Sequence, residues 1–468
     1  MSQYDLLRDA DIEQLGEGLF KVLEEVGILC QNQEMLEALE QRGAIVDYAK
    51  ETATFPKQMS EELLEEIRKE TQATKDSRDE RFRAPSPSGL GTLVAQHFYD
   101  YGTKRRRGGN SVDFIEMIKL SNMLSGGSAG HCLLLTDVPG MMEPLEAAML
   151  LAEYAQKPGP AFAWNVRQTD YLIEMGEIYG IPDWFTWGAI CIAHPFRFDK
   201  DVADRFVRRA RAGGSTGLTA MPVAGVTTPV SVAGFIVVAG AEMFAAWLAA
   251  RALNPDVLLG GSIWGGSINM KTAEVSYSAF DAMFYSFSLA EFLRKWSGKN
   301  INVGGGEYCS AREPGYYAAM EKAYKSMTIA AFTGSHQGIG SGMLDDGKVL
   351  CPVQLMLERE MATGAQFLDK TIEVSPETVP LDSIVDIGFG LTKSYMETEM
   401  TLYDFQKYLW CPQIMEREWD GLKTDEVVLQ RLQDKVDELI ASYEKPAVDP
   451  DKLAKMRAVV ERARKDLL

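Results

Sequence analysis

The sequence predicts an α/β protein built around a (β/α)8 barrel of the TIM type, with helical extensions at both ends. Between residues 81 and 370, short apolar runs alternate with longer amphipathic runs, and the pair recurs eight times. Within the short runs, apolar and polar residues alternate only weakly, which is typical of parallel strands buried on both faces. We therefore expect a helical N-terminal region over 1–80, the barrel with the substrate site over 81–370, and a helical C-terminal cap over 371–468.

The expected strands and helices follow one another along the chain. The strands lie at 93–99, 129–136, 160–166, 185–194, 216–221, 256–264, 301–308 and 332–338. The helices that follow them lie at roughly 112–124, 143–156, 169–179, 200–211, 230–253, 273–297, 314–330 and 352–369. The Gly-rich sequence around the first strand is equally typical of a hairpin that covers the bottom of the barrel.

The two extensions carry signals of their own. Apolar residues recur at three- and four-residue spacing in 11–26 and 60–71, which predicts helices, and the prolines and charges of 77–89 predict a linker into the barrel. The last helix is expected to begin at Asp449-Pro450-Asp451, where acidic side chains meet the positive end of the helix dipole. We expect the C-terminal region to contact a second subunit.

Composition argues against several classes of protein. The formal net charge of −19 disfavours nucleic-acid binding, because contact with phosphates needs a basic face. The one basic cluster, 104–109, is interpreted as a solvated turn, with phosphate or partner docking as the alternative. The apolar run 230–253 is interrupted by Glu242 and Arg251, and the N-terminus is polar, so neither a membrane span nor a signal peptide is expected. The six cysteines form no CxxC pair and are interpreted as reduced thiols of a cytoplasmic protein.

The segment 216–244 predicts one strand, loop and helix. A short strand ends at Met221-Pro222, a Gly-containing turn follows, and Thr227-Thr228-Pro229 is expected to cap and start a long apolar helix. The loop follows the C-terminal end of the strand, which is where barrels hold their reactive residues.

Residues just after the expected strands are therefore the candidates for chemistry. They are Gln96, His97, Thr136, Asp137, Trp164, Asn165, Arg167, His194, Pro222, Ser262, Trp264, Glu307, Tyr308, Arg312, His336, Gln337, Asp345 and Asp346. The chain has no GxSxG nucleophile elbow between an expected strand and its helix, and no HExxH. It has no Walker or dinucleotide fingerprint either, which argues against a bound phosphate cofactor.

The four histidines come from four separate strands, and no two of them have the spacing of zinc ligands. Two or three of them with Asp345 and Asp346 could form a metal site, which leaves a metal-assisted hydrolase or lyase as an alternative. The simpler interpretation of each histidine is a hydrogen-bonded residue at a strand end. His336 is favoured for the site, because its loop is polar and Gly-rich.

Aromatic residues dominate the expected strand ends. Trp164, Trp264 and Tyr308 come from three different strands, and Trp187 joins them if its strand is short. A quaternary ammonium ion cannot donate a hydrogen bond, so aromatic faces bind it through cation–π contacts of roughly 0.5 to 2 kcal/mol each. The pattern predicts a cation cage, with packing in the core as the alternative for each ring.

Four stretches resemble the trimethylamine methyltransferase family, whose members pass a methyl group to a corrinoid protein. Besides 216–244 they are TDVPGMMEPLEAAMLLAEYAQKPG at 136–159, GSGMLDDG at 340–347 and MTLYDFQKYLWCPQIMEREWDG at 400–421. The resemblance extends over nearly the whole chain. It implies a barrel that binds a methylated amine above its strands, no tightly bound cofactor, and a separate corrinoid (cobalamin) protein as a transient partner.

Two departures from the family pattern point to the substrate. Some members carry pyrrolysine in the cavity, whereas this chain has only the ordinary twenty amino acids, so it resembles the nonpyrrolysine branch. A quaternary ammonium departs as a neutral amine and is therefore a better methyl donor than a tertiary amine. The loop 305–322 has Ser310, Arg312 and Gly315 where relatives commonly have acidic and lysine residues, and an arginine favours a ligand with its own carboxylate.

The resemblance thus implies demethylation of a quaternary amine, first of all glycine betaine, by transfer to Co(I), giving dimethylglycine and methyl-Co(III). Proline betaine, carnitine and butyrobetaine are alternative donors, and a non-catalytic quaternary-amine-binding protein is another alternative. No proton moves in the transfer, so no general base is expected. The implied roles are ammonium contact by Trp164, Trp264 and Tyr308, negative potential from Glu307, a bond to the carboxylate from Arg312 or Arg167, and a hydrogen bond to it from His336 or His97.

The docking face and the assembly are further expectations. The corrinoid protein is expected to cover the loops around Thr136, Val226 and Met343, which would form the rim of the barrel. We also expect a homo-oligomer.

Overall fold

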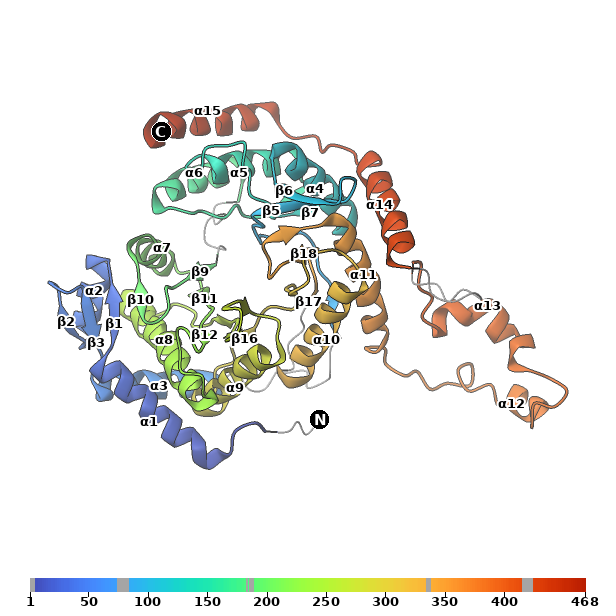
Figure 1. The fold of residues 1–468 in the computed structure, drawn as a ribbon, viewed down its shortest axis with the longest axis horizontal. Helices are drawn as coiled ribbons and strands as arrows, with labels where there is room; N and C mark the ends of the chain where they lie inside the picture. Colours follow the sequence, from blue (N-terminus) through green and yellow to red (C-terminus); the bar gives the residue numbers. More distant parts are fainter. Residues whose placement is uncertain (1–4, 74–83, 182–183, 185–188, 334–337, 415–423) are drawn as a thin grey trace.

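The computed structural model describes residues 5–73, 84–181, 184, 189–333, 338–414 and 424–468. It is a mixed α/β structure in which about half of the chain is helical. Helices surround short central strands (Figure 1). A segment that carries α12 (Leu381–Ile387) and α13 (Glu399–Tyr408) extends away from this body.

Eight of the described short strands in the central region form one parallel sheet and two parallel pairs. Four of them form one sheet in the order β16 (Asn302–Val303), β13 (Ser262–Ile263), β11 (Leu218–Ala220) and β9 (Ile190–Cys191). The other four form two pairs, β7 (Ser128–Ala129) with β8 (Lys157–Pro158) and β17 (Gly338–Ile339) with β4 (Ser86–Pro87). The pair of β17 with β4 joins the end of the central region to its beginning.

The helices expected after the strands are present. They are α4 (Ser111–Leu124), α5 (Glu143–Tyr154), α6 (Thr169–Tyr179), α7 (Lys200–Arg211), α8 (Val232–Leu253), α9 (Phe280–Ser297), α10 (Tyr316–Thr333) and α11 (Pro352–Phe367). The largest difference is at α9, which begins seven residues later than expected, at residue 280 rather than 273. The delay has a physical reason, because β15 (Val275–Ser276) pairs there with β14 (Gly266–Ile268).

The expected first strand, 93–99, forms only in part. Its end belongs to β5 (His97–Asp100), which pairs in parallel with β19 (Val349–Leu350) and forms an antiparallel hairpin with β6 (Arg105–Gly108). Ala95 makes one parallel bridge to Leu133. A parallel strand also precedes it, β4, within what the prolines suggested was a linker.

The long apolar helix α8 starts later than its sequence suggests. Ser231 is its N-cap, and Thr227 instead accepts a hydrogen bond from the Val223 amide at 2.8 Å, which closes the preceding loop. Among the described helices, α8 alone is long and apolar enough to cross a membrane by length and composition, with a mean hydropathy of 1.9, but 72% of that stretch is buried inside the protein. Its apolar character thus serves packing against α1 (Asp9–Glu25), α2 (Gln33–Arg42) and α9.

The N-terminal region contains strands as well as helices. Besides α1, α2 and α3 (Lys57–Ala73), it has β1 (Ile28–Cys30), β2 (Ile45–Asp47) and β3 (Thr52–Thr54). These strands form a sheet with β10 (Arg197–Phe198), which precedes α7. Buried residues of α1 such as Leu19 share one core with Phe244 of α8, so this region packs directly on the helices of the centre.

The C-terminal helices lie along the side of the body. α14 (Asp425–Ala441) packs on α4 and α11, and α15 (Pro450–Leu467) packs on α5 and α6. The side chain of Asp449 accepts a hydrogen bond from the Asp451 amide at 2.9 Å, which confirms the expected start of the last helix.

Candidate functional site

A cavity of about 740 Å³ lies beyond the C-terminal ends of β13 and β16. Its walls come from the β14–β15 hairpin, the loop after β16, and the turn between β18 (Met343–Leu344) and β19 (Val349–Leu350). The lining residues that carry polar side chains are Ser267, Asn269, Glu274, Ser276, Tyr277, Asp281, Ser310, Arg312, Asp345, Asp346 and Lys348. Its volume is within the range of small-molecule sites, roughly 300 to 1,000 Å³.

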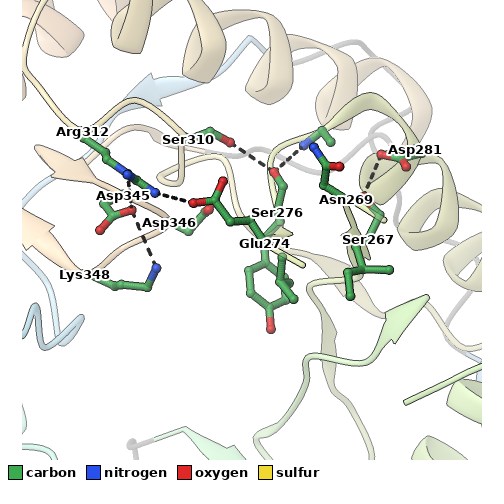
Figure 2. Close-up of a pocket in the computed structure, with 14 residues that line it drawn as sticks. Ser267, Asn269, Glu274, Ser276, Asp281, Ser310, Arg312, Asp345, Asp346 and Lys348 are labelled. Atoms are coloured by element: carbon green, nitrogen blue, oxygen red, sulfur yellow. Dashed lines mark hydrogen bonds and ion pairs between the residues drawn. The ribbon is translucent and has the colours of Figure 1, made fainter. Parts of the chain in front are cut away.

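The mouth of this cavity, defined by Arg106, Glu274, Arg312, Asp345 and Lys348, is a network of opposite charges. Arg312 donates to Glu274 at 2.8 Å and lies 3.5 Å from Asp345 (Figure 2). Lys348 lies 3.7 Å from Asp345, and Arg106 donates to the same carboxylate at 2.7 Å. Arg312 remains 67% exposed. Its guanidinium is therefore accessible to a carboxylate in solution, which would compete with Glu274.

The turn that carries Asp345 has an uncommon backbone. Asp345, Asp346 and Gly347 have φ values of 52°, 51° and 85°, so two non-glycine residues in succession occupy the left-handed region. Each such residue costs on the order of 1 kcal/mol or more and is retained where the surroundings hold it. Here the Asp345 and Asp346 amides each donate at 2.8 Å, to the carbonyls of Ala311 and Cys309. The two loops that form the mouth are thus fixed to each other.

Two of the predicted aromatic residues contact each other behind the mouth. The rings of Trp264 and Tyr308 are perpendicular, with centroids 4.9 Å apart. Each ring lies on a glycine: a Cβ atom added at Gly304 would overlap the indole of Trp264, and one added at Gly347 would overlap the Tyr308 ring. The two glycines, which have no side chain, therefore leave the space in which these two rings pack.

The ionisable groups in and around this pair are half-buried, as Glu307 and Tyr308 are, or buried, as Lys325 is. Burial raises the pKa of the Glu307 carboxyl, and the charges of Lys325 and Lys322 oppose that shift. Burial also raises the pKa of Tyr308, which the charge of Glu307 reinforces. Lys325 is 2% exposed, donates to the Tyr277 carbonyl at 2.6 Å, and has a pKa lowered by burial to about 8.

Cys191 lies at the end of β9. Its residue surface is exposed, yet burial raises the pKa of its thiol, an effect that the charge of Arg205 opposes. A negative charge on Cys191 would add to the raised pKa values of Tyr277 and Tyr308, so the three groups lie within electrostatic range of one another. We call Cys191, Trp264, Tyr277, Glu307, Tyr308 and Lys325 the inner wall.

Trp164 belongs to a different group of side chains. Its indole donates to the buried carboxylate of Glu143 at 2.8 Å, and its ring lies against Phe162 with centroids 4.7 Å apart. Glu143 also accepts from His131 at 2.9 Å, so this histidine is a hydrogen-bonded residue of the interior. Trp164 is 40% exposed, and the ring contact that the described residues give it is with Phe162 rather than with Trp264 or Tyr308.

The structure separates the remaining predicted residues. Arg167 donates to the Asp466 carbonyl of α15, away from the mouth. His97 lies 3.2 Å from the guanidinium of Arg106 and so approaches the mouth through that residue. His194 bonds to Glu242 and to the Met221 amide, as expected of a structural histidine.

Three further expectations concern other positions. His336 and Trp187 lie outside the described residues. The side chain of Met343 is buried in β18 to 1% exposure, whereas Val226 is 56% exposed, and the role of the loops around them as a docking rim stays a prediction. In the part of the chain that the structure describes, no three His, Cys, Asp or Glu side chains are grouped so as to hold a metal ion.

Sequence reasoning missed Arg106, Glu274, Tyr277 and Lys325. Arg106 was visible within the basic cluster but was interpreted as solvated. Lys325 had a signal, because it lies with Lys322 on the face of α10 that also carries the buried Ala318 and Ile329. A lysine on a helix face that is otherwise apolar is a candidate for a buried functional charge.

Comparisons with known proteins agree with this picture of a small-molecule site. The family model described as trimethylamine methyltransferase (MTTB) matches residues 1–467. Trimethylamine methyltransferase MttB2 of Methanosarcina mazei is 24% identical over 282 residues, which cover 58% of this chain and 55% of that protein. The corresponding MttB of Methanosarcina barkeri is 23% identical over 284 residues, again 55% of that protein, so the match spans about half the length of these relatives. Glycine betaine methyltransferase of Desulfitobacterium hafniense is 21% identical over 496 residues, which cover 100% of this chain and 98% of that protein.

Proposed function

This chain belongs to the trimethylamine methyltransferase family, and we propose that it transfers a methyl group from a quaternary amine to the Co(I) centre of a corrinoid protein. Glycine betaine is the proposed donor, and dimethylglycine the product. The observation that carries the proposal is the inner wall, where the nearly perpendicular rings of Trp264 and Tyr308 lie beside the half-buried Glu307. A relative of nearly the same length is a glycine betaine methyltransferase.

The proposed architecture is a (β/α)8 barrel with its site at the C-terminal ends of the strands. Support comes from the order of the parallel pairs, in which β9, β11, β13 and β16 follow the chain and β17 pairs back to β4. The Gly130 amide donates to the Leu90 carbonyl at 2.9 Å, which links the segment after β4 to that after β7. A barrel places loops that are distant in sequence around one opening, as the loops of the mouth are.

The inner wall suits a permanent cation. Because a quaternary ammonium has no N–H to donate, its binding depends on ring faces and on nearby negative charge. Trp264 and Tyr308 supply the faces, and Glu307 in its ionised form supplies the charge. Arg312 at the mouth would take the carboxylate of glycine betaine in a bidentate pair in exchange for Glu274.

The chemical step needs positioning rather than proton transfer. The lone pair of Co(I) forms a bond to the methyl carbon while the C–N bond breaks, and its electrons stay on nitrogen, so a neutral tertiary amine leaves. The corrinoid of the partner protein supplies this nucleophile. The chain's own contribution is to hold the methyl group toward the opening and to keep water from the cation. We place this reaction in the cytoplasm.

The test is methyl transfer with purified components. The protein is mixed with a corrinoid protein reduced to Co(I) and with glycine betaine, proline betaine, carnitine, butyrobetaine, choline or trimethylamine, and the visible spectrum of the corrinoid is followed. Glycine betaine is expected to be converted fastest, with dimethylglycine accumulating in equal amount. If another quaternary amine alone were converted, that amine would be the methyl donor in place of glycine betaine. Conversion of trimethylamine alone would overturn the proposal.

A further inference from the structure

The segment 369–409, which we call the arm, has an unusual surface for a part of a folded chain. Of the 33 large apolar side chains that are exposed in the described part of the protein, 15 lie between residues 372 and 409. Phe389 is 97% exposed, Leu391 88% and Ile372 86%. Only Ile387 of the arm is among the buried residues of the described core. Such a surface marks an interaction site.

The arm leaves the body and returns to the same place. It starts after the last residue of α11, and the chain comes back where the Trp410 indole donates to Thr363 of α11 at 3.4 Å. The amides of Gln413 and Ile414 then both donate to Glu360 of the same helix, at 2.6 Å and 2.9 Å. Between these anchors the arm projects from the body as a loop (Figure 1).

The interactions within the arm are too few to hold it by themselves. Lys393 pairs with Asp386 at 2.6 Å, and Ser375, Ser394 and Thr398 close turns or cap short helices. α12 and α13 have 7 and 10 residues, and isolated helices of that length are unstable in water. Ordering the arm therefore needs a surface that covers its apolar side chains.

A matching uncovered surface lies on the body of the same chain. Phe280 and Phe284 of α9 and Tyr317 and Met320 of α10 are 73%, 44%, 63% and 53% exposed. Their spacing puts each pair on one side of its helix, and Phe280 stacks on Tyr324 of α10 with ring centroids 5.0 Å apart, which joins the two helices. We call these four side chains the α9–α10 strip.

We infer that the arm of each chain packs on the α9–α10 strip of a second copy, so that two chains exchange arms. One chain carries both halves of this contact, the apolar arm and an apolar strip, which is the requirement for a symmetric pair. The arm presents on the order of 1,000 Å² of apolar surface, which is the scale of permanent homodimer interfaces. The corrinoid protein must dissociate in each catalytic cycle, and the apolar surface of the arm would then return to water each time. A second copy of the chain, which can stay bound, therefore fits this surface better.

Oligomeric state tests the inference without any substrate. Light scattering after size exclusion, at about 10 µM chain, is expected to give at least twice the 51.9 kDa mass of one chain. The double substitution Phe389→Asp with Leu391→Asp, and separately Met320→Asp, should each give a mass of one chain with unchanged far-UV circular dichroism. Leu258→Asp is the matched control, because Leu258 is 69% exposed outside both surfaces, and it should stay assembled.

A photo-crosslinking residue at position 389 identifies the surface that the arm meets. In a mixture of ¹⁵N-labelled and unlabelled chains, part of the crosslinks to α9 or α10 should join a labelled peptide to an unlabelled one, which shows that the two peptides come from different chains. A monomeric wild type, an arm variant that stays assembled, or crosslinks confined to other surfaces would overturn the inference. So would a wild type whose arm is crosslinked only when a corrinoid protein is added.

Discussion

Arg312 at the mouth is 67% exposed and pairs with Glu274, whereas Glu307 on the inner wall is half-buried and forms no ion pair in the described part of the chain. At the mouth, the pair of Arg312 with Glu274 is exposed, so it contributes little to stability but can be exchanged for a ligand. On the inner wall, a carboxyl that is costly to ionise lies beside two rings. Under the proposed function, the mouth discriminates among ligands and the inner wall provides cation affinity at the expense of stability.

Gly304→Ala should give the largest effect, because a Cβ atom there would overlap the Trp264 indole and move it from Tyr308. We expect a loss of about 1 to 3 kcal/mol in unfolding free energy from the forced repacking. We also expect loss of quaternary-amine binding by calorimetry. Gly260→Ala is the control, since a Cβ atom at Gly260 would meet nothing within 4 Å. Unchanged amine binding in Gly304→Ala would show that the ring pair does not contact the ligand.

Arg312→Ala should weaken the binding of glycine betaine by about tenfold to a hundredfold and change the binding of choline little. Only glycine betaine loses a charge-assisted pair of hydrogen bonds. Calorimetric titration of both ligands measures the ratio. Arg167→Ala is the matched control, because its guanidinium bonds to α15. Equal losses of affinity for both ligands would show that Arg312 does not bind the carboxylate of glycine betaine.

Trp264→Ala should reduce amine affinity by roughly 0.5 to 2 kcal/mol, and Trp264→Phe should keep part of it, since the ring face attracts the cation. The measurement is the dissociation constant of glycine betaine for both variants. If Phe and Ala behaved alike, the indole would serve packing or hydrogen bonding instead.

The raised pKa of Glu307 predicts a pH dependence of binding. As pH falls through this raised pKa, Glu307 takes up a proton and the negative charge beside the cation is lost, so affinity should begin to fall at a higher pH than an ordinary glutamate would cause. Glu307→Gln should bind several-fold more weakly at neutral pH and lose this dependence. Its melting temperature should rise, because a group whose folded pKa is raised costs stability above that pKa. If amine affinity still fell at low pH in Glu307→Gln, another ionisable group would cause the pH dependence.

Glu274→Gln should have the smallest effect on stability, a shift of at most about 2 °C in melting temperature, because its pair with Arg312 is exposed. Thermal unfolding at low and high salt checks this. The same variant should bind glycine betaine more tightly, since the ligand carboxylate no longer competes with Glu274. A large drop in melting temperature would show that the mouth is structural.

The sequence predicts the helices of the centre well and the strands poorly. α4 to α11 have long amphipathic or apolar patterns that local spacing reveals, whereas strands of two or three residues such as β13 offer too few positions for alternation to be seen. β4 was missed because Ser86 and Pro87 have low strand propensity, and its pairing depends on β17, which is far away in sequence.

The site could be predicted in part for the same reason. Trp264 and Tyr308 follow recognisable strands, so their proximity could be anticipated from barrel geometry. Glu274 comes from the β14–β15 hairpin, an insertion between strand and helix that the sequence did not indicate. Arg106 reaches Asp345 from another hairpin, across 239 residues of chain. Contacts of this kind depend on tertiary structure and leave no local pattern.

The pairing of β17 with β4 also has a consequence for synthesis. Ser86 is paired with Gly338, and at roughly 5 to 20 residues per second the ribosome needs roughly 12 to 50 s to add the chain between them. During that interval the edge of β4 that β17 will occupy stays open and can pair with strands of other nascent chains. Expression at lower translation rates lengthens this exposure, so the yield of native protein should depend on chaperones that shield the unfinished chain more than on the stability of the finished one.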